Sequence, residues 1–184
     1  MNMVSQDARQ RVRVISQRMR FFVLLGVLLA VGGSLWVWCS PELPRFLIAD
    51  LGLVGKVPPG SPELLVRLLG IAVTALPVGL LVYALLEARR LFAEYAEGGF
   101  FNWSAARRLR RIALVICSLA FVGPLTRTLL VLVLTFNNPP GQRLLSIGLS
   151  FNDYFMGMVG GLLLAIAWVM VEAARISEEN REFI

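Results

Sequence analysis

The sequence contains no histidine and only two cysteines among its 184 residues. Histidine is the commonest metal ligand and the commonest general base of proteins, so its absence excludes most zinc sites and catalytic triads. Cys39 and Cys117 are expected near opposite membrane faces, too far apart for a disulfide bond within one chain. The sequence also has no phosphate-binding loop and no nucleophile beside a base. We therefore expect no catalytic, metal-binding or cofactor-binding residues, and an enzyme is the least expected class.

Charged residues are scarce as well. They make up 16% of the chain, against about a quarter in soluble domains, while 57% of the residues are hydrophobic and the mean hydropathy is +0.71. This composition predicts a protein that crosses a membrane several times. The net charge of +6 would fit nucleic-acid binding on a soluble surface, but most basic residues flank apolar runs. We attribute them to membrane topology and expect no direct contact with nucleic acid.

Four apolar runs predict an all-α fold. The first, 21–39, would be about 28 Å long as a helix, close to the hydrocarbon core of about 30 Å. The others are 68–86, 112–131 and 154–171. We expect one membrane domain over residues 1–184, a polytopic four-helix bundle from which a helical hairpin, 87–111, and a tail, 172–184, protrude on the same side.

The basic residues predict the orientation. Thirteen of them precede the first run, lie in the 87–111 hairpin or follow the fourth run, whereas the opposite loops hold Arg45, Lys56, Arg67 and Arg143. The positive-inside rule then places both termini and the hairpin in the cytoplasm. Interfacial aromatic anchors are expected at one face from Trp36, Trp38 and Tyr154 and at the other from Trp168. An apolar stripe before residue 20, with arginines on its other faces, predicts contact with membrane lipid.

Small residues recur every four positions in two runs and predict close helix packing. The stripes are Gly26, Ala30 and Ser34 in the first run and Gly157, Gly161 and Ala165 in the fourth. Such stripes serve contacts within one chain or between copies, so a homo-oligomer is an open alternative.

Arg127 is the one charge well inside an apolar run, which makes it a candidate functional residue. It also lies about 6 Å from the expected end of its helix, within reach of water for its long side chain. Both interpretations stay open, as does an ion pair with Asp153 or Asp50.

The segment "AEGGFFNWSAARRLRR" forms the turn of the hairpin and combines aromatic residues with arginines. It fits either a tip packed on itself or on the membrane, or an exposed site for a protein partner. The tail has the opposite charge and is expected to continue the fourth helix. The candidate partner-binding residues of hairpin and tail are Tyr95, Gly98, Phe101, Trp103, Arg107, Arg108, Arg110, Arg111, Glu178, Glu179 and Asn180.

The two segments "LFAEYAEGGFFNWSAARRLRRIA" and "VMVEAARISEENREFI" resemble a family of bacterial four-span membrane proteins, the domain-of-unknown-function family 2975. Tyr95, Gly98, Phe101 and the run 109–112 match its hairpin motif, and 178–180 match its glutamate-rich tail. The resemblance extends from the first run to the tail, with Ala173 or Ala174 where such proteins often have glycine. It implies a bacterial inner-membrane protein without an established activity, whose genes often neighbour a small helix-turn-helix regulator.

Two functions remain in view. The first is a non-enzymatic scaffold or sensor whose cytoplasmic hairpin and tail bind a protein partner, such as that transcription regulator. The second is a subunit of a small-solute or lipid transporter that acts as an oligomer. No carboxylate lies deep in an apolar run, which argues against proton-coupled transport and favours the first function.

Overall fold

The computed structural model describes residues 3–57, 62–96, 103–139 and 143–182, and the side chains of 18–57, 62–95, 103–139 and 143–176. These residues form five α-helices and no strand, so the predicted all-α class is confirmed. The helices are α1 (Met3–Cys39), α2 (Arg45–Asp50), α3 (Leu64–Ala96), α4 (Trp103–Thr135) and α5 (Phe151–Glu182). All but the short α2 are long and apolar enough to cross a membrane, as the four apolar runs predicted.

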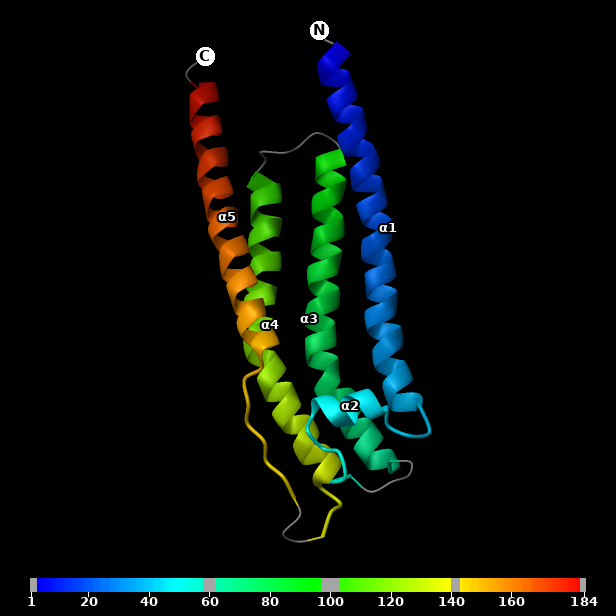
Figure 1. Ribbon diagram of the computed structural model, residues 1–184. Helices are drawn as coiled ribbons and strands as arrows, with labels where there is room; N and C mark the ends of the chain where they lie inside the picture. The colour runs from blue at the N-terminus through cyan, green and yellow to red at the C-terminus, as the bar shows by residue number, and fades with distance from the viewer. Residues whose placement is uncertain (1–2, 58–61, 97–102, 140–142, 183–184) are drawn as a thin grey trace.

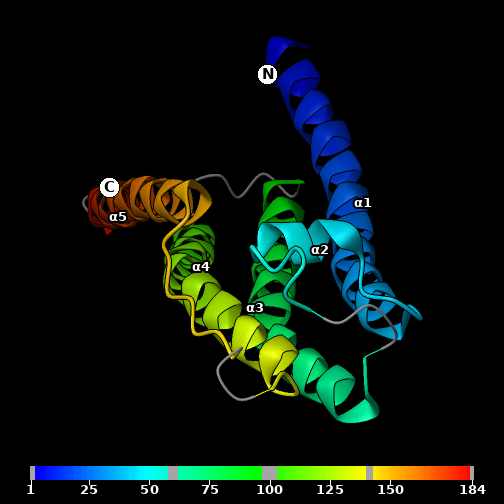
Figure 2. The same cartoon turned by 60° about the horizontal axis from the view of Figure 1, so that its bottom comes forward.

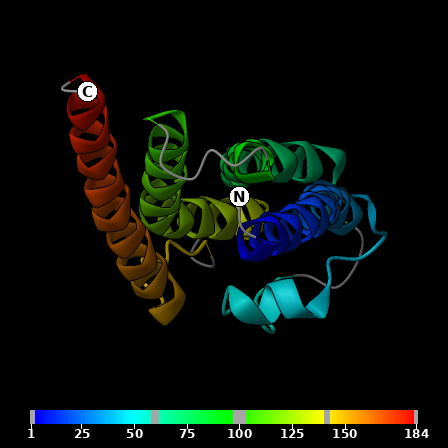
Figure 3. The same ribbon diagram turned by 90° about the horizontal axis from the view of Figure 1, so that it is seen from above.

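The four long helices stand in a row, in the order α1, α3, α4, α5 (Figure 1). Among the described residues each packs only against its neighbour in this row, so α5 does not close onto α1. The view from above shows α5 and α1 on opposite sides of the α3–α4 pair (Figure 3). One broad face of each outer helix is therefore left for lipid or for another protein.

The start of α1 and the end of α5 lie at the same end of the row as the end of α3 and the start of α4 (Figure 1). At 33 residues each, α3 and α4 are about 50 Å long, well above the hydrocarbon thickness of about 30 Å. The two helices therefore extend beyond any membrane that they cross, as the predicted protruding hairpin requires. We call this end, with the termini and the hairpin, the hairpin end.

The opposite end of the row carries a compact apolar core. Side chains of α2 pack there, and Figure 2 shows α2 at this end of the row. Gly52, at φ 66°, ends α2 in the left-handed conformation that favours glycine. The buried members of this core come from α1, α3 and α4 and from the connection between α1 and α3: Trp38, Leu43, Leu51, Leu53, Val66, Leu130, Val131 and Leu134.

Trp38 belongs to this core, and its predicted role as an interfacial anchor is wrong. Its side chain is 2% exposed, and its indole Nε1 donates a hydrogen bond to Thr74 Oγ1 at 3.1 Å. The ring lies directly over Gly70, where a Cβ atom would come within 2.1 Å of it. Trp36, by contrast, is 61% exposed, as an anchor should be. The two tryptophans lie on different faces of α1 because they are only two residues apart.

Arg67 closes the connection between α1 and α3. Its guanidinium donates hydrogen bonds to the carbonyl oxygens of Trp38, Pro41 and Pro62, each at 3.2 Å. The Trp38 carbonyl is among the last of α1, where backbone acceptors lack partners within the helix. Arg67 thus caps α1 from the neighbouring helix.

The side of α5 that packs on α4 is not the predicted stripe. Its buried positions recur every seven residues, a period typical of left-handed helix pairs. They are Asp153, Gly160, Ala167 and Ala174. Of the predicted stripe, Gly157 faces Ala120 of α4, whereas Gly161 and Ala165 are exposed. Within one chain the prediction is therefore wrong for Gly161 and Ala165. On α1, Gly26 does face α3, through Leu85, with Ala30 and Ser34 partly buried beyond it.

Candidate functional site on the helical hairpin

A buried carboxylate joins α3 to α4 near the hairpin end. Glu87 of α3 is 1% exposed, and its Oε1 accepts a hydrogen bond from Arg90 Nη1 at 2.7 Å. Its Oε2 accepts one from Arg108 Nη1 of α4 at 3.2 Å, and Arg111 Nη1 lies 3.9 Å away. A buried charge is tolerated only when such partners surround it. Glu87 therefore fixes the position of two α4 arginines.

A second carboxylate, Glu94, extends this network two turns nearer the tip. Arg108 Nε donates to Glu94 Oε1 at 2.5 Å, and Ser104 Oγ donates to Glu94 Oε2 at 3.0 Å. Arg108 therefore holds both carboxylates of α3 at once. Apolar packing completes the tip, because Leu91, Ala105 and Ala106 are all buried. The hairpin is packed on itself, as one of the two sequence alternatives expected.

The outward face of the same hairpin carries an aromatic ring among cations. Trp103 is 43% exposed, and the guanidinium carbon of Arg107 lies 5.9 Å from its ring centroid. Arg107, Arg110 and Arg111 are also exposed. We call Trp103, Arg107, Arg110 and Arg111 the hairpin patch. Arg108 was a candidate partner-binding residue, but its guanidinium is already bound to Glu87 and Glu94. We therefore assign it a structural role instead.

The remaining candidates divide into two groups. Tyr95 is half-buried and already engaged within the chain. Gly98 and Phe101 lie outside the described residues, as do the side chains of Glu178, Glu179 and Asn180. The backbone confirms that the tail continues α5 to Glu182. Contact between tail and hairpin stays a prediction.

Replacing Arg108 with alanine should destabilise the hairpin, because it leaves the buried Glu87 and the partly buried Glu94 without their shared donor. Arg108 itself is 26% exposed, so we expect a loss of about 1 to 2 kcal/mol. Arg110→Ala, two residues on and exposed, is the matched control and should change stability by less than about 0.5 kcal/mol. Equilibrium unfolding in mixed micelles measures both. Equal effects of the two substitutions would contradict the assigned role.

A second polar site lies near the start of α5. Asp153 Oδ2 accepts hydrogen bonds from the backbone N–H and the hydroxyl of Ser150, both at 2.8 Å, and from Arg127 Nη1 at 3.3 Å. The N–H of Asp153 donates in return to Ser150 Oγ at 3.3 Å. This reciprocal pattern is a capping box that starts α5. The charge of Arg127 is thus compensated by Asp153 and not by Asp50.

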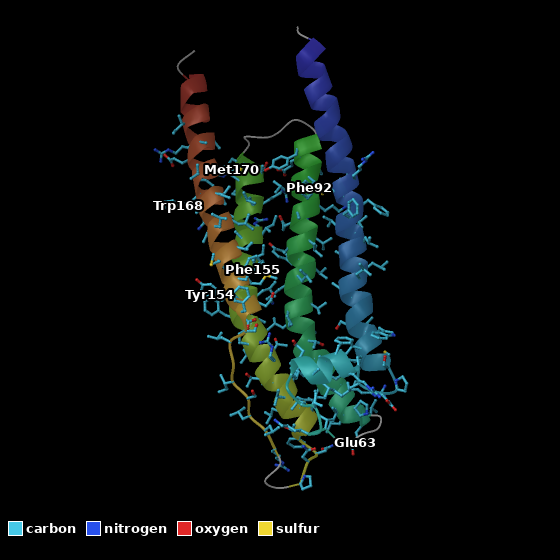
Figure 4. The ribbon with its side chains drawn as sticks, in the orientation of Figure 1. Glu63, Phe92, Tyr154, Phe155, Trp168 and Met170 are labelled. Atoms are coloured by element: carbon cyan, nitrogen blue, oxygen red, sulfur yellow. The ribbon has the colours of Figure 1, made fainter. Side chains whose placement is uncertain are left out.

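A cavity of about 460 Å³ adjoins this site between α4 and α5. Its volume is in the range of small-molecule sites. Apart from Asp153, the walls of the cavity are almost wholly apolar. Tyr154 is one of the wall residues and lies near the first turn of α5 (Figure 4). The described side chains hold no group of three or more histidine, cysteine, aspartate or glutamate residues that could bind a metal ion.

Four helices that are long and apolar enough to cross a membrane define a multi-pass α-helical membrane protein. The chain belongs to the DUF2975 family, described as a protein of unknown function, whose model matches residues 48–184. The family resemblance of the hairpin and tail is confirmed. Its expected extent is wrong, because the match begins within α2 and leaves out α1. Comparison with curated proteins and with solved structures finds no significant match.

Three residues that organise these sites were missed from the sequence: Glu87, Glu94 and Asp153 as a cap. A signal was present for Glu87 and for Asp153. Glu87 and Arg90 are three residues apart on one helical face, which suits an ion pair. Ser150 and Asp153 have the spacing of a capping box directly before an apolar helix. The pairing of Arg108 with both α3 carboxylates had no signal, because it depends on how α4 packs against α3.

Proposed function

We propose that this chain is a non-enzymatic membrane scaffold or sensor that binds a cytoplasmic protein partner on its hairpin patch. The observation that carries the proposal is an exposed tryptophan flanked by arginines on a hairpin that a buried ion-pair network holds in shape. Tryptophan and arginine are the residues that contribute most to protein interfaces. A rigid support lowers the entropy lost on binding.

The charge of the hairpin patch indicates the partner surface. Arg107, Arg110 and Arg111 are cationic, so an acidic surface with a pocket for the Trp103 ring would complement them. The positive-inside rule, applied to the basic residues, supports a cytoplasmic position for this face in a bacterial cell. The partner suggested by the family resemblance is a helix-turn-helix regulator. Sensing would require two arrangements of the helices with different affinity for that partner.

A photoreactive residue in place of Trp103, in intact cells, tests this assignment. We expect a covalent adduct with one cytosolic protein, reduced about tenfold by Arg107→Glu with Arg110→Glu, since a loss of about 1.4 kcal/mol changes affinity by that factor. A photoreactive residue at Phe136, 50% exposed at the opposite end, is the matched control and should not capture this protein. Adducts with lipid and with the chain itself alone would contradict partner binding and leave the patch as a membrane anchor.

We do not extend the proposal to transport. Arg127 is a candidate functional residue because it lies inside an apolar run, and in the structure Asp153 at the start of α5 already neutralises it. The described contacts give this pair a structural role in joining α4 to α5.

A further inference from the structure

Asp153 has one carboxylate oxygen in use and one unused. All its hydrogen bonds with described residues go to Oδ2. Oδ1 accepts none of them and points toward Gly123 of α4, where a Cβ atom would come within 2.9 Å of it. Asp153 as a whole is 5% exposed. Every fully buried side-chain oxygen among the described residues has a hydrogen-bond partner, so the unpaired Oδ1 must be partly accessible. Asp153 is also one of the residues that line the adjoining cavity.

The rest of the cavity is suited to a hydrocarbon chain. Its walls come from α4, α5 and the segment that precedes α5, and they are Cys117, Ala120, Phe121, Leu149, Gly157 and Met158, together with Tyr154. Phe121, Leu149, Tyr154 and Met158 are between 57% and 84% exposed, so the cavity opens on the outer surface of the row. Because α4 and α5 are membrane-crossing helices by length and composition, that surface faces the lipid.

Arg127 adds a third chemical feature beside the cavity. Its side chain is 28% exposed, and among the described residues only its Nη1 is bound, to Asp153. The N–H groups on Nε and Nη2 remain for an anion, and guanidinium groups bind phosphate well. An unused carboxylate oxygen, an arginine with free donors and an apolar cavity thus lie together near one end of the α4–α5 pair.

We propose that this cavity binds a phospholipid whose headgroup has N–H donors, such as phosphatidylethanolamine. One acyl chain fills the apolar cavity, the ammonium group donates to Asp153 Oδ1, and the phosphate accepts from Arg127. A trimethylammonium headgroup has no N–H donor and cannot make the first of these bonds. The site is separate from the hairpin patch and does not depend on partner binding there.

Photolabelling in vesicles tests this site. The purified full chain is placed in phosphatidylcholine vesicles with a small fraction of either phosphatidylethanolamine or phosphatidylcholine, each with the same photoreactive acyl chain. We expect the ethanolamine lipid to label the residues around 117–121 and 154–158 about fivefold more than the choline lipid. Asp153→Asn should remove this preference. The side-chain carbonyl oxygen of the asparagine can still cap α5, while its amide nitrogen is a hydrogen-bond donor in place of the acceptor Oδ1.

Two tryptophan variants keep the test independent of the Asp153 cap. Met158→Trp at the cavity mouth should block labelling by both lipids. Leu162→Trp, one turn further along α5, is 64% exposed and does not line the cavity, so it should leave labelling unchanged. Equal labelling by the two lipids, or labelling insensitive to Met158→Trp, would overturn the site. A crosslink to a second copy of the chain at these residues would overturn it too and would assign the cavity to an oligomer contact.

Discussion

Replacing Gly160 with alanine should separate α5 from α4. The added Cβ would lie 2.7 Å from Cys117 Sγ and 2.8 Å from the backbone nitrogen of Cys117. A side chain can rotate away, but a helix backbone can only move as a body, so the two axes must part along their whole contact. Helices in lipid depend on such close approach because burial of apolar surface contributes little there. We expect a loss of about 3 kcal/mol, at the upper end of overpacking effects.

Gly161→Ala is the matched control for this substitution. Gly161 is the next residue of the same helix, and nothing within 4 Å would meet its Cβ. The higher helix propensity of alanine should leave stability unchanged or raise it by up to about 1 kcal/mol. Equilibrium unfolding in mixed micelles distinguishes the two variants. If Gly161→Ala proved the more damaging, the stripe predicted from the sequence would be the true packing face, through contacts between copies.

Replacing Gly70 with alanine should displace Trp38 from the core at the end opposite the hairpin. The added Cβ would lie between 2.1 and 2.4 Å from three carbon atoms of the indole. Trp38 cannot shift freely, because it is 2% exposed and its Nε1 is bonded to Thr74. The connection made by Arg67 to the Trp38 carbonyl would be strained as well. We expect a loss of about 2 to 3 kcal/mol and greater protease sensitivity between α1 and α3.

Two further variants separate this clash from a general effect of alanine in α3. Gly79→Ala lies on the same helix with open space around its Cβ and should change stability little. Trp38→Leu removes the indole atoms that meet the new methyl group. The double variant Gly70→Ala, Trp38→Leu should then lose less stability than the sum of its single variants. Simple additivity would show that the Gly70 contact with Trp38 does not limit the packing.

The sequence determined which segments are helical and apolar enough to cross a membrane. Runs such as 21–39 and 112–131 are read directly from local composition, because a helix in lipid satisfies all its backbone hydrogen bonds within itself. The hairpin could be predicted in the same way, since the helix-forming residues after 86 continue α3 without a break. The exposure of Trp103, Arg107 and Arg110 was one of the alternatives that the sequence left open, and the packing of α3 and α4 decided it.

Only the tertiary structure decided which faces of these helices meet. Two series of small residues in α5 have spacings suited to packing, and composition alone does not choose between them. One is Gly157, Gly161 and Ala165, and the other runs through Gly160 and Ala167. The choice follows from the position of α4, whose Cys117 leaves space only for glycine at 160. In the same way, contact with α3 separated Arg108 from its exposed neighbours on α4, and the nearness of Gly70 placed Trp38 in the core. Such contacts join residues far apart in the chain, whereas sequence periodicity records only the order of residues along one helix.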